Sequence, residues 1–437
     1  MPEAASTRVR WFLVFGLFVL SAVAYVDRIN IAIAGSSLAF EFHLTKVQWG
    51  ALTSAFLLGY GLFQTLGGWL ADRLGPRRVL AVGVLWWGIF TALTTAVSSK
   101  IAFAFFYLMA VRFFLGAGEA VMFPASNQFV SRWIPTQERG IANGIIFAGV
   151  GVGAGVTPVL ITYIMVHYGW RSSFWASALL GLIAGTAWYL LARDTPEEHS
   201  HVSRAELEHI QAGRTTSSSA TSKTSESRIP WSTILVSKDV WAVTFGYFCF
   251  GYIAWIFFTW FFDYLRTVRG LDLKASASFT TLLFLTMAAC SPLGGAISDK
   301  LTKLYGKRIG RCGIAAFALL LTAIFLAFGS QVHSARLASI VLAGGAGALY
   351  LSQSSFWSVT ADIASGSSGS VSGFMNMGNQ LGGFLTAMLT PAIASRLGWT
   401  VPFYVGAGLA VMGAVAWLFV NPERTLRPAS SSFRSTE

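Results

Sequence analysis

Two pairs of opposite charges stand inside stretches that are otherwise apolar. Asp27 and Arg28 are neighbours within "SAVAYVDRINIAIAG", and Arg112 and Glu119 lie seven residues apart within "RFFLGAGE". A charge at the centre of a bilayer costs at least ~2.5–3.5 kcal/mol, so such residues usually serve binding or proton transfer. Guanidinium groups suit bidentate carboxylate binding, and a carboxylate in a low-dielectric environment can take up a proton. The four residues therefore predict an anion site coupled to a proton site.

Depth along the helices allows these four residues to share one cavity. At ~1.5 Å per residue they fall within a slab of ~10 Å, although Asp27 and Arg28 diverge by about 100° around their helix. We expect Arg28 and Arg112 to bind the anion and Glu119 and Asp27 to carry protons, because the six histidines all read as loop or span-end residues. The alternative is that the charges only pair helices. We favour function, because buried ion pairs rarely stabilise a fold more than apolar residues would.

The composition indicates an all-α polytopic membrane protein. Of the 437 residues, 54% are hydrophobic and only 11% are charged, whereas soluble domains carry roughly 25% charged residues. A membrane span needs ~20 apolar residues. The sequence predicts twelve such spans, over 11–38, 47–71, 79–98, 101–131, 137–166, 170–192, 237–265, 275–299, 309–330, 335–361, 369–395 and 399–420.

The distribution of charge predicts the orientation in the bilayer. The net charge is +12, but most of the Lys and Arg residues lie in the loops on one side of the predicted spans. This positive-inside bias places both termini in the cytoplasm and explains the basic charge without a nucleic-acid partner. The absence of any Asn-x-Ser/Thr sequon favours a bacterial inner membrane.

Cys249, Cys290 and Cys312 have no metal-like spacing, so we expect neither a metal nor a cofactor.

A polar segment divides the predicted spans into two halves. Residues 194–236 are Ser/Thr-rich and charged, which predicts a cytoplasmic linker between bundles over 1–193 and 237–437. The segment "GGWLADRLGPRR" recurs as "GGAISDKLTKLYGKR" in the second half. Paired glycines permit close helix packing, and the acid can sit at a neighbouring helix N-terminus. We expect this repeat to form a conformational loop built from Gly68, Asp72, Arg73, Gly75, Arg77, Arg78 and Asp299.

The second half offers hydroxyls and amides at the depth where the first half offers charges. The stretches "YLSQSSFW" and "FMNMGNQ" place Ser352 and Gln353 in one predicted span and Asn376 and Asn379 in another. Helix packing alone is the other explanation for any single residue of this kind. An anion clamp facing hydroxyl-matching groups fits a small polyhydroxylated acid. Three aromatic residues are further candidates for the cavity wall: Tyr25, Tyr60 and Trp357.

Several of these motifs together resemble one family. The glycine–Asp–basic turn resembles the signature loop of the major facilitator superfamily. "YVDRIN", "RFFLGAGEAVMFP", "WIPTQERG", "FTWFFDYL" and "FMNMGN" resemble its anion:cation symporter branch, above all the bacterial proton-coupled carriers of hexuronates, aldonates and glucarate. The resemblance implies two six-helix bundles, in which the helix-1 and helix-4 Arg residues handle the substrate carboxylate and the Glu and Asp are protonated.

We therefore expect a transporter, not an enzyme, that imports a small organic anion by proton symport and alternating access as a functional monomer. A carrier of an aromatic or dicarboxylic acid, or an uncoupled uniporter or exchanger, is the alternative.

One departure from the resembled family concerns the pocket. Many sugar-acid members carry Gln or Asn midway along helix 5, whereas "FAGVGVGAGVTP" (147–158) is small or apolar here. The exact acid stays open.

Overall fold

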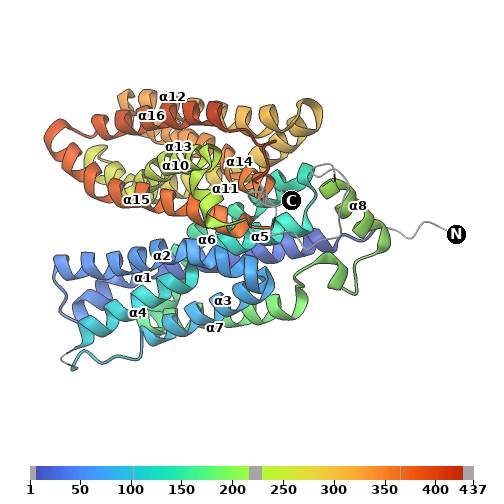
Figure 1. Cartoon of the computed structure of the whole chain (residues 1–437). Helices are drawn as coiled ribbons and strands as arrows, with labels where there is room; N and C mark the ends of the chain where they lie inside the picture. The colour runs from blue at the N-terminus through green and yellow to red at the C-terminus, as the bar shows by residue number, and fades with distance from the viewer. Residues whose placement is uncertain (1–5, 102, 216–228, 365, 427–437) are drawn as a thin grey trace, which may run out of the picture.

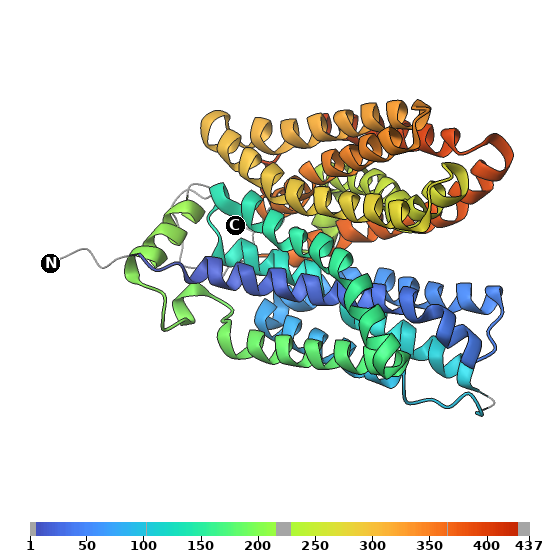
Figure 2. The same cartoon turned by 180° about the vertical axis from the view of Figure 1, so that it is seen from behind.

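The computed structural model describes residues 6–101, 103–215, 229–364 and 366–426, and its elements are helices throughout. They form two bundles that lie side by side (Figures 1 and 2). The first bundle contains α1 (Val9–Glu41), α2 (Lys46–Leu74), α3 (Pro76–Leu93), α4 (Ala104–Glu119), α5 (Met122–Trp133), α6 (Arg139–Tyr168) and α7 (Trp170–Leu191).

The second bundle mirrors the first in its number of long helical segments. It contains α10 (Lys238–Asp263), α11 (Leu273–Tyr305), α12 (Ile314–Gln331), α13 (Ala335–Leu351), α14 (Gln353–Ile363), α15 (Ser368–Leu397) and α16 (Thr400–Ala416). Two short helices, α8 (Arg204–Thr215) and α9 (Trp231–Val236), belong to the connection. The beginning of α1 lies at the same end of the molecule as α8, which we call the α8 end (Figure 1).

Most of the predicted spans are confirmed as long apolar helices. Within the described residues, nine helical stretches are long and apolar enough to cross a membrane. The other three predicted spans correspond to α2, α3 and α15, which are less apolar. The helix α3 begins with Arg77 and Arg78, and α15 is rich in Gly, Ser and Asn. Their lower hydropathy suits helices that pack between others.

The fourth predicted span of each half is a broken helix rather than a continuous one. The break between α4 and α5 falls at Ala120 and Val121, directly after Glu119. Pro124 lacks the N–H that would bond to the carbonyl of Ala120. The break between α13 and α14 falls at Ser352, whose hydroxyl donates to the carbonyl of Leu349 at 2.6 Å and so competes with the helical bond.

The described part of the linker contains the helix α8, while residues 216–228 lie outside the described residues. Its Glu206 is fully buried and accepts hydrogen bonds from the backbone N–H of Val9 and Arg10 at 3.1 and 3.2 Å. Arg10 also donates to Glu206 at 3.0 Å. A carboxylate at a helix N-terminus is stabilising, which explains why this polar segment docks.

The two bundles meet closely at the α8 end through glycines. A Cβ atom on Gly68 of α2 would lie 1.9 Å from the carbonyl oxygen of Gly369 at the start of α15. A Cβ atom on Gly295 of α11 would lie 2.2 Å from the carbonyl oxygen of Gly140 at the start of α6. Only glycine permits such approaches, so the close packing expected of the repeated Gly-Gly pairs is confirmed.

The repeated aspartates also occupy the positions expected of them. Asp72 accepts hydrogen bonds from the backbone N–H of Gly369 and Ser370, at 3.0 and 2.8 Å. Asp299 accepts from the N–H of Gly140 and Ile141, at 2.9 and 2.7 Å. Each carboxylate therefore caps the first turn of a helix in the opposite bundle, where the helix dipole favours negative charge.

The basic residues of the turn after Asp72 make contacts within the first bundle. Gly75 has φ +88°, and the backbone N–H of Arg77 donates to Asp194 at 2.9 Å. The Arg77 guanidinium lies 4.4 Å from the Tyr189 ring centroid, and that of Arg73 lies 4.3 Å from the Trp69 ring centroid. Arg78 is exposed.

Candidate substrate-binding site

A small cavity of about 30 Å³ lies between the two bundles, near the middle of their helices. Six of the nine residues predicted to bind substrate line it: Tyr25, Arg28, Tyr60, Gln353, Asn376 and Asn379. The first bundle adds Phe123, Phe147 and Val150, and the second adds Tyr247, Phe250, Ala254, Trp255, Phe258, Tyr350 and Gln380. Tyr25 and Phe258 meet from opposite bundles, with ring centroids 5.9 Å apart. The cavity therefore has one wall from each bundle.

Arg28 provides the positive charge of the first wall, which is the wall formed by the first bundle. Its guanidinium donates to Oε2 of Glu119, at 2.7 Å from Nη2 and 3.3 Å from Nε. The same group lies 4.8, 5.2 and 4.4 Å from the ring centroids of Tyr25, Phe56 and Tyr60. Aromatic faces attract a cation, so the rings hold the guanidinium at the cavity while Glu119 balances its charge.

The partner of Arg28 is completely enclosed. Glu119 is 0% exposed, and its Oε1 has no hydrogen-bond partner among the described residues. It is the last residue of α4, so it lies directly before the interruption between α4 and α5. A buried carboxylate with one oxygen unpaired is a group that can accept a proton.

Asp27 does not line the cavity. Adjacent side chains on a helix diverge by about 100°, so Asp27 and Arg28 point in different directions. Oδ2 of Asp27 accepts a hydrogen bond from the Thr91 hydroxyl of α3 at 2.5 Å, and its Oδ1 has no partner among the described residues. Asp27 interacts electrostatically with Arg112 and Glu119. The expected divergence of the two α1 charges is confirmed, and the four charges interact with one another, but only Arg28 of the four lines the cavity.

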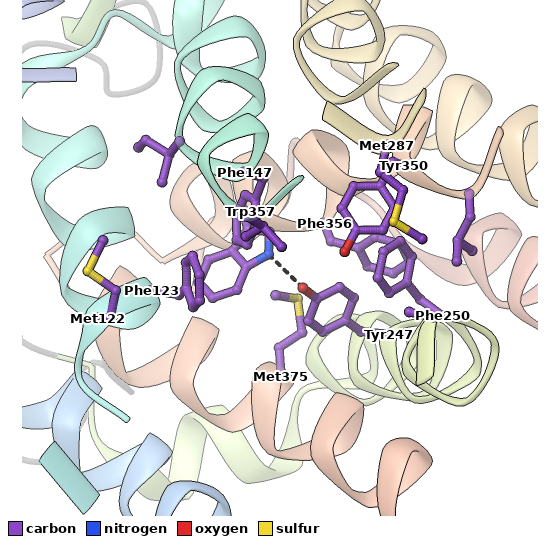
Figure 3. Packing of buried hydrophobic residues seen from close by; sticks show 14 of the residues in the cluster. Met122, Phe123, Phe147, Tyr247, Phe250, Met287, Tyr350, Phe356, Trp357 and Met375 are labelled. Carbon is purple, nitrogen blue, oxygen red and sulfur yellow. Dashed lines mark hydrogen bonds between the residues drawn. The ribbon is translucent and has the colours of Figure 1, made fainter. Parts of the chain in front are cut away.

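The second wall is a hydrogen-bonded set of neutral groups. The Tyr247 hydroxyl of α10 accepts hydrogen bonds from Nε2 of Gln353 and from Nε1 of Trp357, both at 2.9 Å. Figure 3 shows the indole of Trp357 directed at this hydroxyl, with Phe123 and Phe147 beside it. Oε1 of Gln353 is buried without a partner among the described residues. Its acceptor is therefore free for a hydroxyl donor in the cavity.

The two asparagines of α15 lie on one face, as their spacing predicts. Both line the cavity, and Nδ2 of Asn376 donates to Oε1 of Gln64 in α2 at 2.8 Å. Gln64 is fully buried, and its Nε2 has no partner among the described residues. This bond joins the two bundles directly beside the cavity.

Three predicted binding residues do not line the cavity. Arg112 is buried beside Phe56, with its guanidinium 4.7 Å from that ring. The Ser352 hydroxyl donates a hydrogen bond to the carbonyl of Leu349, in the helix that precedes it. Trp357 is 1% exposed because Phe123 and Phe147 cover its indole. Of the three, Trp357 contacts the wall indirectly, through its hydrogen bond to Tyr247.

Sequence reasoning missed the other ten residues that line the cavity, among them Gln380, Tyr247 and Phe147. Gln380 directly follows the quoted asparagines, so the same helical argument could have found it. Tyr247 gave no signal, because α10 contains another buried tyrosine, Tyr252, that does not reach the cavity. Phe147 and Val150 occupy the apolar stretch of α6 that departs from the resembled family. That departure makes this part of the cavity wall apolar.

The fold and the cavity together define a polytopic membrane transporter, and comparison with known proteins names its family. The sequence matches the profile of the Major Facilitator Superfamily over residues 17–387 and 305–435. This chain belongs to the Major Facilitator Superfamily. It is a transporter of anions, not an enzyme.

Individual relatives agree with this assignment. A probable sulfoacetate transporter of Cupriavidus necator is 34% identical over 410 residues, covering 92% of both chains. A hexuronate transporter of Bacillus subtilis is 27% identical over 412 residues and covers 93% of both. The solved structure of a proton:xylose symporter has a TM-score of 0.74 at 14% identity, covering 95% of this chain and 97% of the other, which shows the shared fold.

Proposed function

We propose that this protein is a proton-coupled symporter that imports a small organic anion, and that the anion is a sugar acid. The observation that carries the proposal is the pairing of Arg28 with Glu119 at the cavity wall. A substrate carboxylate and Glu119 compete for one guanidinium. A proton on Glu119 removes its charge and frees Arg28 for the substrate, so binding of proton and anion is linked.

Asp27 and Arg112 lie outside the cavity lining and interact electrostatically with this pair. Arg112 interacts electrostatically with both Asp27 and Glu119. When Glu119 is neutral and Arg28 binds the substrate, Asp27 balances Arg112. In this scheme Glu119 is the coupling residue, and Asp27 is a second site for a proton.

The polar second wall supports a polyhydroxylated substrate. Gln353, Asn376, Asn379 and Gln380 bring amide donors and acceptors to the cavity, and the Gln353 carbonyl oxygen is unpaired among the described residues. A sugar acid places its carboxylate at Arg28 and its hydroxyls at these amides. Unpaired buried polar atoms reject a ligand that cannot satisfy them.

The contacts between the bundles support a transport cycle by alternating access. The contacts through Gly68, Gly140, Gly295 and Gly369 close the molecule between the cavity and the α8 end. We propose that bundles over 1–193 and 237–437 rock about the cavity, and that these contacts break when the cavity opens toward the α8 end. Asp72 and Asp299 then leave the helix N-termini that they cap.

Uptake by reconstituted protein tests this function. Proteoliposomes are given labelled hexuronates, aldonates or aldarates with and without an inward-directed pH gradient. A monoanion that moves with one proton is driven by the pH difference alone, about 1.36 kcal/mol per pH unit. A second proton adds the membrane potential, ~2.3 kcal/mol per 100 mV. We expect accumulation only with the gradient, whereas equal uptake without it would identify a uniporter or exchanger.

A second candidate substrate is a small sulfonated acid. The relative from Cupriavidus necator is named as a probable sulfoacetate transporter and matches 92% of this chain. Phe147 and Val150 make part of the cavity apolar, so this part offers no partners to the hydroxyls of a long polyol. Sulfoacetate therefore belongs in the same uptake panel, and a preference for it over every sugar acid would replace the sugar-acid proposal.

We propose that the α8 end faces the cytoplasm of a bacterial cell. Single cysteines are introduced at Glu208 in α8 and at Ser99 at the opposite end, in a chain whose three native cysteines are replaced by Ala. An impermeant maleimide applied to intact cells should label Ser99→Cys only. Labelling of Glu208→Cys instead would reverse the orientation.

A further inference from the structure

A second pocket lies at the α8 end, on the outer side of the first bundle and away from the cavity. It is formed by the beginning of α1, the end of α7 and the loop that follows α7, and its volume is about 510 Å³. Its polar lining includes Arg8, Arg193, His199 and His201, and the described residues that line it include no carboxylate. The pocket is therefore a basic site without a counter-charge of its own.

The remaining lining of this pocket is apolar and exposed. Phe12 is 57% exposed, and Leu190 and Leu191 are 64% and 48% exposed. These side chains belong to α1 and α7, which are both apolar enough to cross a membrane. Because the pocket lies at the ends of these helices, we expect its apolar part to face the hydrocarbon and its basic part to lie at the membrane surface. A ligand that fits both parts has a negative head and an apolar body.

The loop that carries the basic groups is held in place. The indole N–H of Trp133 in α5 donates to the carbonyl of Arg193 at 3.1 Å, and its ring contacts His199 with centroids 5.7 Å apart. Nε2 of His199 bonds to the carbonyl of Leu191 at 3.1 Å, and Nδ1 accepts from the N–H of His201 at 3.3 Å. In the neutral imidazole one ring nitrogen can donate and the other can accept, which matches these two hydrogen bonds. Burial also lowers the pKa of His199. This imidazole is a neutral support for the loop.

The positive charge of the pocket thus comes from two arginines. Nη1 of Arg193 donates to the carbonyls of Leu190 and Ala192, at 2.9 and 2.7 Å, which fixes its guanidinium at the end of α7. The side chain of Arg8 is exposed and has no hydrogen-bond or ion-pair partner among the described residues. Arginine is well suited to phosphate because its planar fork can donate two parallel hydrogen bonds.

We propose that this pocket binds an anionic phospholipid, with its phosphate between Arg8 and Arg193 and its acyl chains along Phe12 and Leu190. Charge complementarity selects a negative headgroup, and the exposed apolar residues select a lipid over a free anion. The inference does not depend on which anion the cavity transports. Juxtamembrane basic residues attract anionic lipid with about 1 kcal/mol each, which corresponds to roughly fivefold in affinity per arginine.

Lipid binding to the purified full chain tests the proposal. Phosphatidylglycerol or phosphatidylcholine is titrated onto the protein in detergent, and bound lipid is counted by native mass spectrometry. Arg8→Gln combined with Arg193→Gln should weaken phosphatidylglycerol binding roughly thirtyfold. The matched control is Lys300→Gln with Lys303→Gln, which removes the same charge from exposed positions at the end of α11 and should leave binding unchanged.

Three outcomes would overturn the assignment: equal binding by the Arg8/Arg193 variant, an equal loss in the lysine control, or equal affinity for phosphatidylcholine. Displacement of phosphatidylglycerol by millimolar inorganic phosphate would also overturn it, because it would identify a site for free anions. If the double variant unfolds, Arg8→Gln alone is measured. Arg8 is exposed, so that change should leave the fold intact and still weaken binding about fivefold.

Discussion

The two walls of the central cavity differ in chemistry although the two bundles repeat the same plan. The first wall carries a cation, Arg28, whose charge is balanced by Glu119 at 2.7 Å. The second wall is neutral: Tyr247 holds Gln353 and Trp357 through hydrogen bonds of 2.9 Å. Charge-assisted bonds contribute roughly 1.5–3 kcal/mol and neutral bonds about 0.5–1.5 kcal/mol. The first wall should therefore govern affinity and coupling, and the second wall should govern the choice among acids.

The helix breaks show the same division of roles. In the first bundle the break after α4 directly follows Glu119 and places a titratable group at the interruption. In the second bundle the break falls at Ser352, directly before Gln353, and places an amide there. One architecture thus presents a buried carboxylate on one side of the cavity and a hydrogen-bonding amide on the other.

The largest effect is expected from Glu119→Gln. Glutamine resembles a permanently protonated glutamate, so the carrier can still bind the anion and cycle while loaded, but it cannot release a proton. The variant should keep substrate counterflow in vesicles and lose accumulation against a gradient at every pH tested. Glu41→Gln is the control, because Glu41 pairs with Arg171 at 2.6 Å outside the cavity and should leave accumulation intact.

If Glu119→Gln still concentrates substrate when a pH gradient is imposed, Glu119 is not the coupling residue. Asp27→Asn would then be the decisive variant, because Asp27 is the other buried carboxylate that interacts with Arg112.

Arg28→Lys should produce the next largest effect. Lysine keeps the charge but loses the planar fork, and the loss of one charge-assisted hydrogen bond costs about 1.5–3 kcal/mol, or roughly 10- to 150-fold in affinity. We expect the KM for uptake to rise by that factor with normal membrane insertion. Arg112→Lys should raise the KM less, because Arg112 does not line the cavity. A larger effect at Arg112 would show that the substrate reaches behind Phe56 during transport.

The charged wall could be predicted from sequence because its signal is strong. Asp27, Arg28, Arg112 and Glu119 stand out against apolar surroundings, and the physical cost of burying a charge makes each one informative. The repeated glycine–Asp turn likewise predicted both helix caps, because a carboxylate next to a helix N-terminus is a favourable arrangement wherever the chain permits it. The order of helices followed from the same apolar runs.

The neutral wall was only partly predictable, because hydroxyl, amide and indole groups are common in helix packing. Ser352 and Trp357 read like cavity residues, yet one bonds to its own helix and the other is covered by Phe147. Tyr247 was missed for the converse reason. Its role depends on Gln353, 106 residues away, and no local pattern encodes such a partner. Linker docking through Glu206 escaped prediction in the same way.

Tyr247→Phe tests the neutral wall. The change removes the acceptor of two buried donors, on Gln353 and Trp357, so the amide loses its fixed orientation. The KM for a polyhydroxylated acid should rise roughly 2- to 12-fold, the range of a neutral hydrogen bond. The KM for an acid without hydroxyls should change less. Tyr252→Phe is the matched control in the same helix, because its buried hydroxyl has no partner among the described residues. Equal shifts for both acids would assign Tyr247 to packing only.

Ser352→Ala should have the smallest effect, although Ser352 is adjacent to Gln353 in the chain. Its hydroxyl donates to the carbonyl of Leu349 at 2.6 Å and lies outside the cavity lining. We expect less than about a twofold change in KM, since the substrate loses no direct bond and a neutral bond within one helix contributes only about 0.5–1.5 kcal/mol. Gln353→Ala, measured beside it, should raise the KM for polyhydroxylated acids as Tyr247→Phe does. If Ser352→Ala matches Gln353→Ala, the helix break that the hydroxyl supports is itself needed to aim the amide.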